Sequence, residues 1–119
     1  EQSGGALVSF KVVVANAFSA SMLGKKGKVC YQEIDQDEAA EMLLSADEVR
    51  STIGHEGTAH VFSQLLRADL PARREFYKLV EQDTLLVGSI NIRLPEGKVL
   101  SADELAELPV RWLLIHECT

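Results

Sequence analysis

The sequence predicts an α/β fold: a single domain with a mixed sheet of about five strands flanked by helices. The chain has 119 residues, of which 46% are apolar and 25% charged, as expected for one globular domain. Segments rich in β-branched residues alternate with segments whose apolar residues recur every three or four positions. Because short turns connect these segments, one sheet with helices packed against it accommodates them best.

The first predicted strand lies in the centre of this sheet. Residues 8–15 are almost continuously apolar and β-branched, which is typical of a strand buried on both faces. Residues 16–23 are expected to form a loop or a short helical turn, followed by a solvated turn at 24–27. Because the chain starts without methionine, residues 1–5 are expected to be a tag remnant or linker, and residues 6–119 the domain.

Strands and helices continue to alternate in the middle of the chain. Residues 28–34 are expected to form the second strand, and Asp35 with Glu38 has the spacing of a capping box that starts a short helix. Residues 49–53 are predicted to be extended. Residues 55–67 are predicted to form a helix, because one apolar stripe runs along them. The stripe consists of Ala59, Val61, Phe62, Leu65 and Leu66.

The last third of the chain adds two more strands and a helix. Residues 75–80 are expected to be extended, and residues 84–94 to form a strand with one core face and one face that can meet ligand. The second face would carry Ser89, Asn91 and Arg93. A second capping box, formed by Ser101 and Glu104, predicts a short helix, and residues 110–116 the final strand.

Charge and hydropathy exclude several classes of function. The net charge of −6 argues against nonspecific binding of long nucleic acid, which requires a broad basic surface. A small anionic ligand needs only a local cluster of basic groups. No apolar run approaches the ~20 residues of a membrane span, and the chain does not start with a signal-peptide pattern. We therefore expect a cytoplasmic protein that does not bind membranes.

The two cysteines give no sign of a metal site. Cys30 and Cys118 are far apart in the sequence and lack the close spacing of zinc ligands. In a cytoplasmic protein we expect both thiols to be reduced.

His55 is the first candidate for chemistry. It follows Gly54 at the predicted start of a helix, where free backbone N–H groups favour an anion such as phosphate. An imidazole can act there as a general acid on the leaving oxygen of a phosphodiester. His55 could equally be an ordinary helix-start residue. His60 lies five positions on, which does not fit the metalloprotease spacing, and is expected at the surface.

Arginines and polar loop residues form the second group of candidates. Arg73, Arg74 and Arg93 could bind phosphate oxygens through their guanidinium groups, or form a solvated charged edge. Glu96, in the turn after Arg93, could orient an arginine or contact a ribose, or be solvated. The polar residues after the first strand could line a ligand site or cap a local turn. These residues are Asn16, Ser19 and Ser21.

Four separated segments together resemble a known family. They are residues 15–23 (ANAFSASML), 54–59 (GHEGTA), 71–74 (PARR) and 93–101 (RLPEGKVLS). In order and spacing they are similar to the small viral anti-CRISPR ring nuclease family. This family also has bacterial members, some of them fused to CRISPR effector domains, and a fusion of that kind is an expected context for this chain.

The resemblance implies a homodimer that binds cyclic tetra-adenylate at its interface and uses no metal or other cofactor. His55 would be the general acid that protonates the departing 5′ oxygen, while the 2′ hydroxyl of the substrate attacks phosphorus. The product would be linear di-adenylate ending in a 2′,3′-cyclic phosphate, which would switch off type III CRISPR signalling.

The resemblance also implies a set of substrate-binding residues. Arg74 and Arg93 match ligand-holding arginines, and Glu96 matches a glutamate near the ribose. Four further residues complete the pocket: Asn16, Ser19, Ser21, where some members carry asparagine, and Gly54.

Two other functions fit the sequence without cleavage. One is a module that sequesters or senses a cyclic nucleotide, for which a proton donor at His55 is unnecessary. The other is a structural or protein-interaction domain with no nucleotide affinity.

Overall fold

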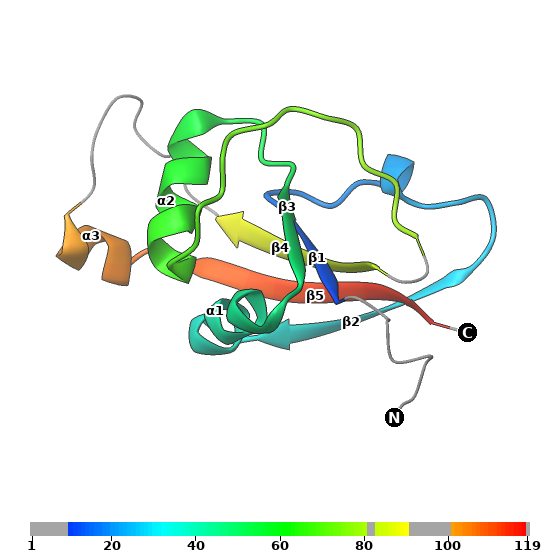
Figure 1. Ribbon diagram of the computed structural model, residues 1–119, viewed down its shortest axis with the longest axis horizontal. Helices are drawn as coiled ribbons and strands as arrows, with labels where there is room; N and C mark the ends of the chain where they lie inside the picture. Colours follow the sequence, from blue (N-terminus) through cyan, green and yellow to red (C-terminus); the bar gives the residue numbers. More distant parts are fainter. Residues whose placement is uncertain (1–9, 81–82, 91–100, 119) are drawn as a thin grey trace.

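The computed structural model of the chain describes residues 10–80, 83–90 and 101–118 (Figure 1). The described strands are β1 (Lys11–Ala15), β2 (Lys28–Ile34), β3 (Glu48–Ser51), β4 (Asp83–Ile90) and β5 (Val110–Cys118). The helices are α1 (Gln36–Ser45), α2 (Glu56–Leu66) and α3 (Ala102–Ala106), with a short 3-10 turn η2 (Ala20–Met22).

The strands form one mixed sheet in the order β2-β5-β4-β1-β3. Strand β1 pairs in parallel with both β3 and β4, whereas β5 runs antiparallel to β4 and β2. Val12, Val13 and Val14 of β1 have no exposed surface, because β1 has a strand on each side and a covered face above and below. The predicted fold class is confirmed. The first strand is an interior strand buried on both faces, as predicted, but the middle strand of the sheet is β4.

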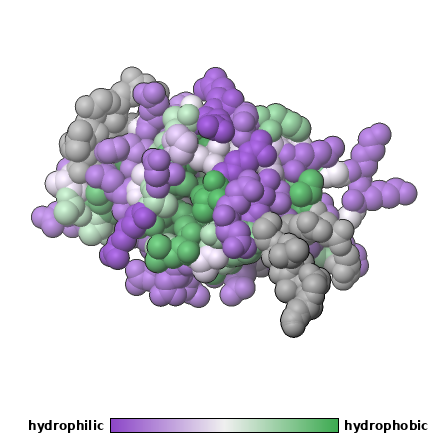
Figure 2. Space-filling view, viewed as in Figure 1, coloured by the Kyte–Doolittle hydropathy of each residue, from purple (hydrophilic) through white to green (hydrophobic). Residues whose placement is uncertain are grey.

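Helices α1 and α2 cover one face of this sheet (Figure 1). The predicted apolar stripe of α2 is fully buried there, and the Phe62 ring lies 4.9 Å from the Trp112 ring of β5. Gly88 of β4 permits this close packing: a Cβ at Gly88 would lie 2.5 Å from Trp112 Cζ3 and 2.6 Å from Phe62 Cζ. On the outside, polar side chains dominate the face seen in Figure 2, with a smaller apolar area among them.

The opposite face is covered by residues 70–80, which we call the strap. The strap leads from α2 to β4 and contains no helix or strand (Figure 1). Tyr77 and Leu79 point inward and pack with Val13, Leu85 and Val87 of the sheet. The predicted extended segment at 75–80 therefore keeps the alternation of a strand but does not join the sheet.

Local sequence signals locate the helix starts correctly. The capping box of Asp35 and Glu38 is present at α1, and that of Ser101 and Glu104 at α3. The predicted strand at 84–94 begins at Asp83 and is described as far as Ile90; its remainder lies outside the described residues. The expected tag remnant or linker at 1–5 also lies outside them.

The expectation of reduced thiols is wrong, because Cys30 and Cys118 form a disulfide. Strands β2 and β5 run antiparallel with Cys30 opposite His116, which brings Cys118 within 5.8 Å, Cα to Cα. The two cysteines are separated by 88 positions, so only the strand pairing brings them together. Among the described residues, no helix is long and apolar enough to cross a membrane.

Candidate functional site

The parallel strands β1, β3 and β4 end at one edge of the sheet, and the described loops after β1 and β3 begin there. Val14 of β1 lies opposite Ser51 of β3 on one side and Leu86 of β4 on the other. The carboxyl ends of parallel strands therefore meet here, which is where open α/β sheets bind ligands. After β3, the chain stays close to β1, since the N–H of Thr52 donates to the Val14 carbonyl at 2.9 Å.

His55 occupies the N-cap position of α2 at this edge. Its backbone is extended, with φ −121° and ψ 130°, and its side chain makes no capping hydrogen bond. The imidazole is exposed, and the first N–H groups of the helix lie beside it. Glu56, an exposed acidic residue, shares this first turn. His55 thus starts the helix with its backbone, while its side chain remains available to a ligand.

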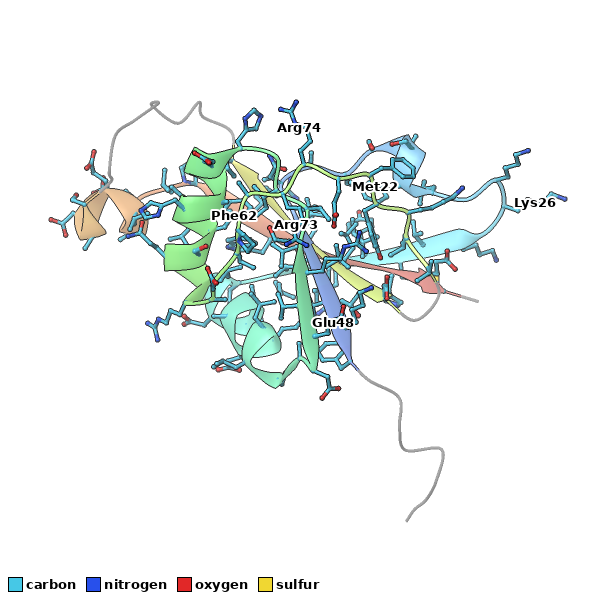
Figure 3. The ribbon with its side chains drawn as sticks, turned by 45° about the horizontal axis from the view of Figure 1, so that its top comes forward. Met22, Lys26, Glu48, Phe62, Arg73 and Arg74 are labelled. Carbon is cyan, nitrogen blue, oxygen red and sulfur yellow. A yellow bond between two sulfur atoms is a disulfide. The ribbon has the colours of Figure 1, made fainter. Side chains whose placement is uncertain are left out.

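Arg74 of the strap stands next to Gly54, the residue before His55. A Cβ at Gly54 would lie 3.5 Å from Arg74 Nε and 4.0 Å from its Cβ and Cγ. In Figure 3, Arg74 projects outward from the strap on the side of the molecule where α2 begins. Arg74 is exposed and has no ion pair with the part of the chain that the structure describes. Gly54 is therefore next to His55 in the chain and next to the Arg74 side chain in space, and neither side chain is ion-paired with another described residue.

The loop after β1 brings polar residues to the same edge. Asn16 is half-buried and directly follows the last residue of β1. The exposed hydroxyls of Ser19 and Ser21 are hydrogen-bonded to each other at 2.9 Å. The Met22 carbonyl accepts a hydrogen bond of 2.8 Å from Leu79 N–H, which ties this loop to the strap. The described side chains of this loop make no direct contact with His55 or Arg74 through hydrogen bonds.

Two predicted site residues cannot be placed. Arg93 and Glu96 lie outside the described residues, as does Asn91. Of the three residues predicted on the ligand-facing side of that strand, only Ser89 is described, and it is half-buried. Earlier in β4, the same face carries Leu85 and Val87, which are buried beneath the strap.

The lysines near the turn at 24–27 lie elsewhere. Lys25, Lys26 and Lys28 line a hollow of about 260 Å³ near the start of β2, together with Glu117 of β5. No group of three or more His, Cys, Asp or Glu residues is placed to hold a metal ion within the described ranges.

Sequence reasoning missed the polar contacts that fasten the strap. Ser51 Oγ donates to the Pro71 carbonyl at 2.7 Å, and Arg73 N–H donates to the Ile53 carbonyl at 2.7 Å. Arg50 Nε donates to Glu75 Oε1 at 2.6 Å, and this hydrogen bond holds the pKa of Glu75 below its ordinary value. Because the Arg50–Glu75 pair spans 25 positions, no local pattern indicates it.

Comparisons with known proteins agree on a viral family. The STIV B116-like family model matches residues 12–112. The solved structure of B116 from Sulfolobus turreted icosahedral virus has a TM-score of 0.80 and 28% identity, covering 89% of this chain and 98% of that one. ORF116 of Acidianus filamentous virus 1 is 29% identical over 78% of this chain and 80% of its own length. Protein 26 of Sulfolobus islandicus filamentous virus is 33% identical, over 68% of each chain.

This finding corrects the family assignment made from the sequence. The four segments were assigned to the viral anti-CRISPR ring nuclease family, whereas the family model that matches is the STIV B116-like one. All four segments, at 15–23, 54–59, 71–74 and 93–101, fall within the range that this family model matches.

Proposed function

The chain belongs to the STIV B116-like family, and from the geometry of its site we propose that it binds cyclic tetra-adenylate as a homodimer and cleaves the ring without a metal ion. One observation carries the proposal: where α2 begins, His55 follows Gly54 and the Arg74 side chain packs against Gly54, and neither side chain is bonded to another described residue. This pair of groups suits phosphodiester cleavage, because one can hold the phosphate and the other can protonate the leaving oxygen.

Phosphate binding rests on features that do not depend on net charge. The N–H groups in the first turn of α2 point toward the same edge as Arg74, and both favour an anion. Gly54 has no side chain, so the Arg74 side chain lies close to the start of α2, with Nε 3.5 Å from where a Cβ of Gly54 would be. A ligand of few phosphates is therefore bound locally although the whole chain carries a charge of −6.

The proposed reaction uses the substrate's own nucleophile. The 2′ oxygen of one ribose attacks the adjacent phosphorus and loses its proton to solvent, while the bond from phosphorus to the 5′ oxygen breaks. The imidazolium of His55 donates its proton to that 5′ oxygen. Two such cuts turn the ring into linear di-adenylates ending in 2′,3′-cyclic phosphates. Cleavage would end the signal that the ring carries in type III CRISPR defence.

A homodimer accounts for apolar groups left exposed on the outer side of the strap. Phe76 and Val80 are 70% and 51% exposed, and their spacing in an extended segment places them on one side, opposite Tyr77 and Leu79. Burial of such large apolar side chains against a second copy is favourable. A two-fold dimer would present two copies of His55 and Arg74 to a ring that has its own two-fold axis.

Incubation of the protein with cyclic tetra-adenylate in EDTA tests the proposal. We expect linear products from the wild type, and a cleavage rate about 100- to 10,000-fold lower for His55→Ala with binding retained. His60→Ala is the matched control, because His60 is exposed on the same helix and should leave the rate unchanged. Binding without cleavage by the wild type would identify a sequestering or sensing module. No binding would reject the nucleotide function and favour a protein-interaction domain.

A further inference from the structure

The strap is held at several points, and these bracket the residue that we assign to phosphate binding. Before Arg74 in the chain, the Ser51 hydroxyl donates a hydrogen bond to the Pro71 carbonyl, and the Arg73 N–H donates one to the Ile53 carbonyl. After Arg74, the Glu75 carboxylate accepts a hydrogen bond from Arg50. Long connections without secondary structure in a small domain are commonly functional, so fixed contacts in the strap call for an explanation beyond chain connection.

The Arg50–Glu75 pair anchors the residue that directly follows Arg74 in the chain. The two groups are about one-third exposed, 34% and 30%, and the Nε–Oε1 distance is 2.6 Å. Arg50 projects from the edge strand β3, and its guanidinium carbon also lies 5.8 Å from the centre of the inward-facing Tyr77 ring. The contact with Glu75 raises the pKa of Arg50 and lowers that of Glu75, so both stay charged.

We infer that Arg50 and Glu75 are positioning residues, whose ion pair fixes the strap so that Arg74 stands over Gly54 beside His55. The inference rests on the proposed function of that site. Arg73 and Glu75 are the two neighbours of Arg74 in the chain. The backbone N–H of Arg73 donates to the Ile53 carbonyl, just after β3, and the Glu75 carboxylate accepts from Arg50 of β3. Because both neighbours are held, the position of the Arg74 backbone is restricted.

The sign of one effect separates positioning from simple electrostatics. Glu75 places a negative charge next to a phosphate-binding arginine, so charge alone predicts that Glu75→Ala would tighten anion binding. Positioning predicts the opposite, because a released strap no longer holds Arg74 against Gly54. Arg50→Ala weakens binding under either explanation and is less informative.

The test is the affinity of the full-length chain for cyclic tetra-adenylate in Glu75→Ala, measured with wild type and control. We expect binding about tenfold weaker in Glu75→Ala, and recovery in the charge-exchanged double variant R50E/E75R. Glu33→Ala is the matched control: Glu33 pairs with Arg111 at 2.8 Å between β2 and β5, away from the strap. Equal or tighter binding in Glu75→Ala would overturn the inference.

Hydrogen exchange of the Arg73 amide gives a readout that needs no ligand. If the pair holds the strap, this amide exchanges faster in Glu75→Ala than in wild type. Its exchange rate in Glu33→Ala equals that of wild type. Wild-type protein that binds no ring would reject the proposed function, while faster exchange would still establish that the pair holds the strap. Unchanged exchange would overturn the inference whatever the ligand does.

Discussion

The polar residues at the two ends of the parallel strands β1, β3 and β4 differ in their bonding. At the end where these strands begin, Tyr77 Oη donates to Asp83 Oδ2 at 2.6 Å, and Lys11 Nζ lies 4.0 Å from Asp83 and 3.9 Å from Glu48. At the end where they finish, His55 and Arg74 are exposed and make no such pair with the described residues.

The difference separates polar groups that hold the fold from those that are free to bind. A buried carboxylate such as Asp83, only 6% exposed, must be hydrogen-bonded because desolvation otherwise disfavours its charge. Exposed side chains such as Arg74 have no such requirement. Substitutions at the first end should therefore change stability, and substitutions at the second end should change ligand binding.

Arg74→Ala should give the largest change among these tests. Because hydrogen bonds to charged groups contribute about 1.5–3 kcal/mol, we expect cyclic tetra-adenylate to bind about 10- to 150-fold more weakly. The melting temperature should not change. Titration calorimetry with thermal unfolding measures both quantities, and Lys78→Ala, an exposed cation of the same strap, serves as control. A large loss of stability in Arg74→Ala would contradict the conclusion that residues at this end of the strands serve binding rather than stability.

Tyr77→Phe should destabilise the protein by about 1–3 kcal/mol, because Asp83 loses a hydrogen-bond donor in a buried position. Denaturant unfolding measures this free energy. Tyr31→Phe is the matched control, since Tyr31 is 74% exposed, and it should be neutral. Equal stability of the two variants would show that the Tyr77 hydroxyl does not hold the strap.

Alkaline pH should lower the free energy of unfolding through Tyr77, which lies at the same end of the strands. Burial and the hydrogen bond to Asp83 raise the pKa of Tyr77 above its ordinary value of 10.0. The folded state therefore keeps the phenolic proton more tightly than the unfolded state does. Its contribution to stability is complete below pH 10 and falls as the pH rises further, by at most about 1.4 kcal/mol per pH unit. Unfolding of wild type and Tyr77→Phe from pH 8 to about 11 should show a steeper decline in wild type.

Lys11→Met should have the smallest effect, about 0.5 kcal/mol. Lys11 is partly exposed, and its distances of 3.9 Å and 4.0 Å to the two carboxylates are long for ion pairs. Denaturant unfolding at low and high salt would check this value. A loss as large as that for Tyr77→Phe would mean that Lys11 is the main partner of Asp83.

The sequence determined the parts of this protein that depend on neighbours in the chain. The apolar run at 8–15 indicated a strand buried on both faces, and side chains three positions apart located the capping boxes of α1 and α3. His55 was placed at the start of α2 for the same reason, because the apolar stripe and Gly54 define where that helix begins.

Only the tertiary structure decided which distant groups meet. The disulfide of Cys30 and Cys118 follows from the antiparallel pairing of β2 and β5. The contact of Gly54 with Arg74 follows from the path of the strap, which has no helical or strand pattern strong enough to fix it. Local signals reach only a few residues, whereas these contacts depend on how the whole sheet is ordered, so the sequence named the candidate residues and the fold brought them together.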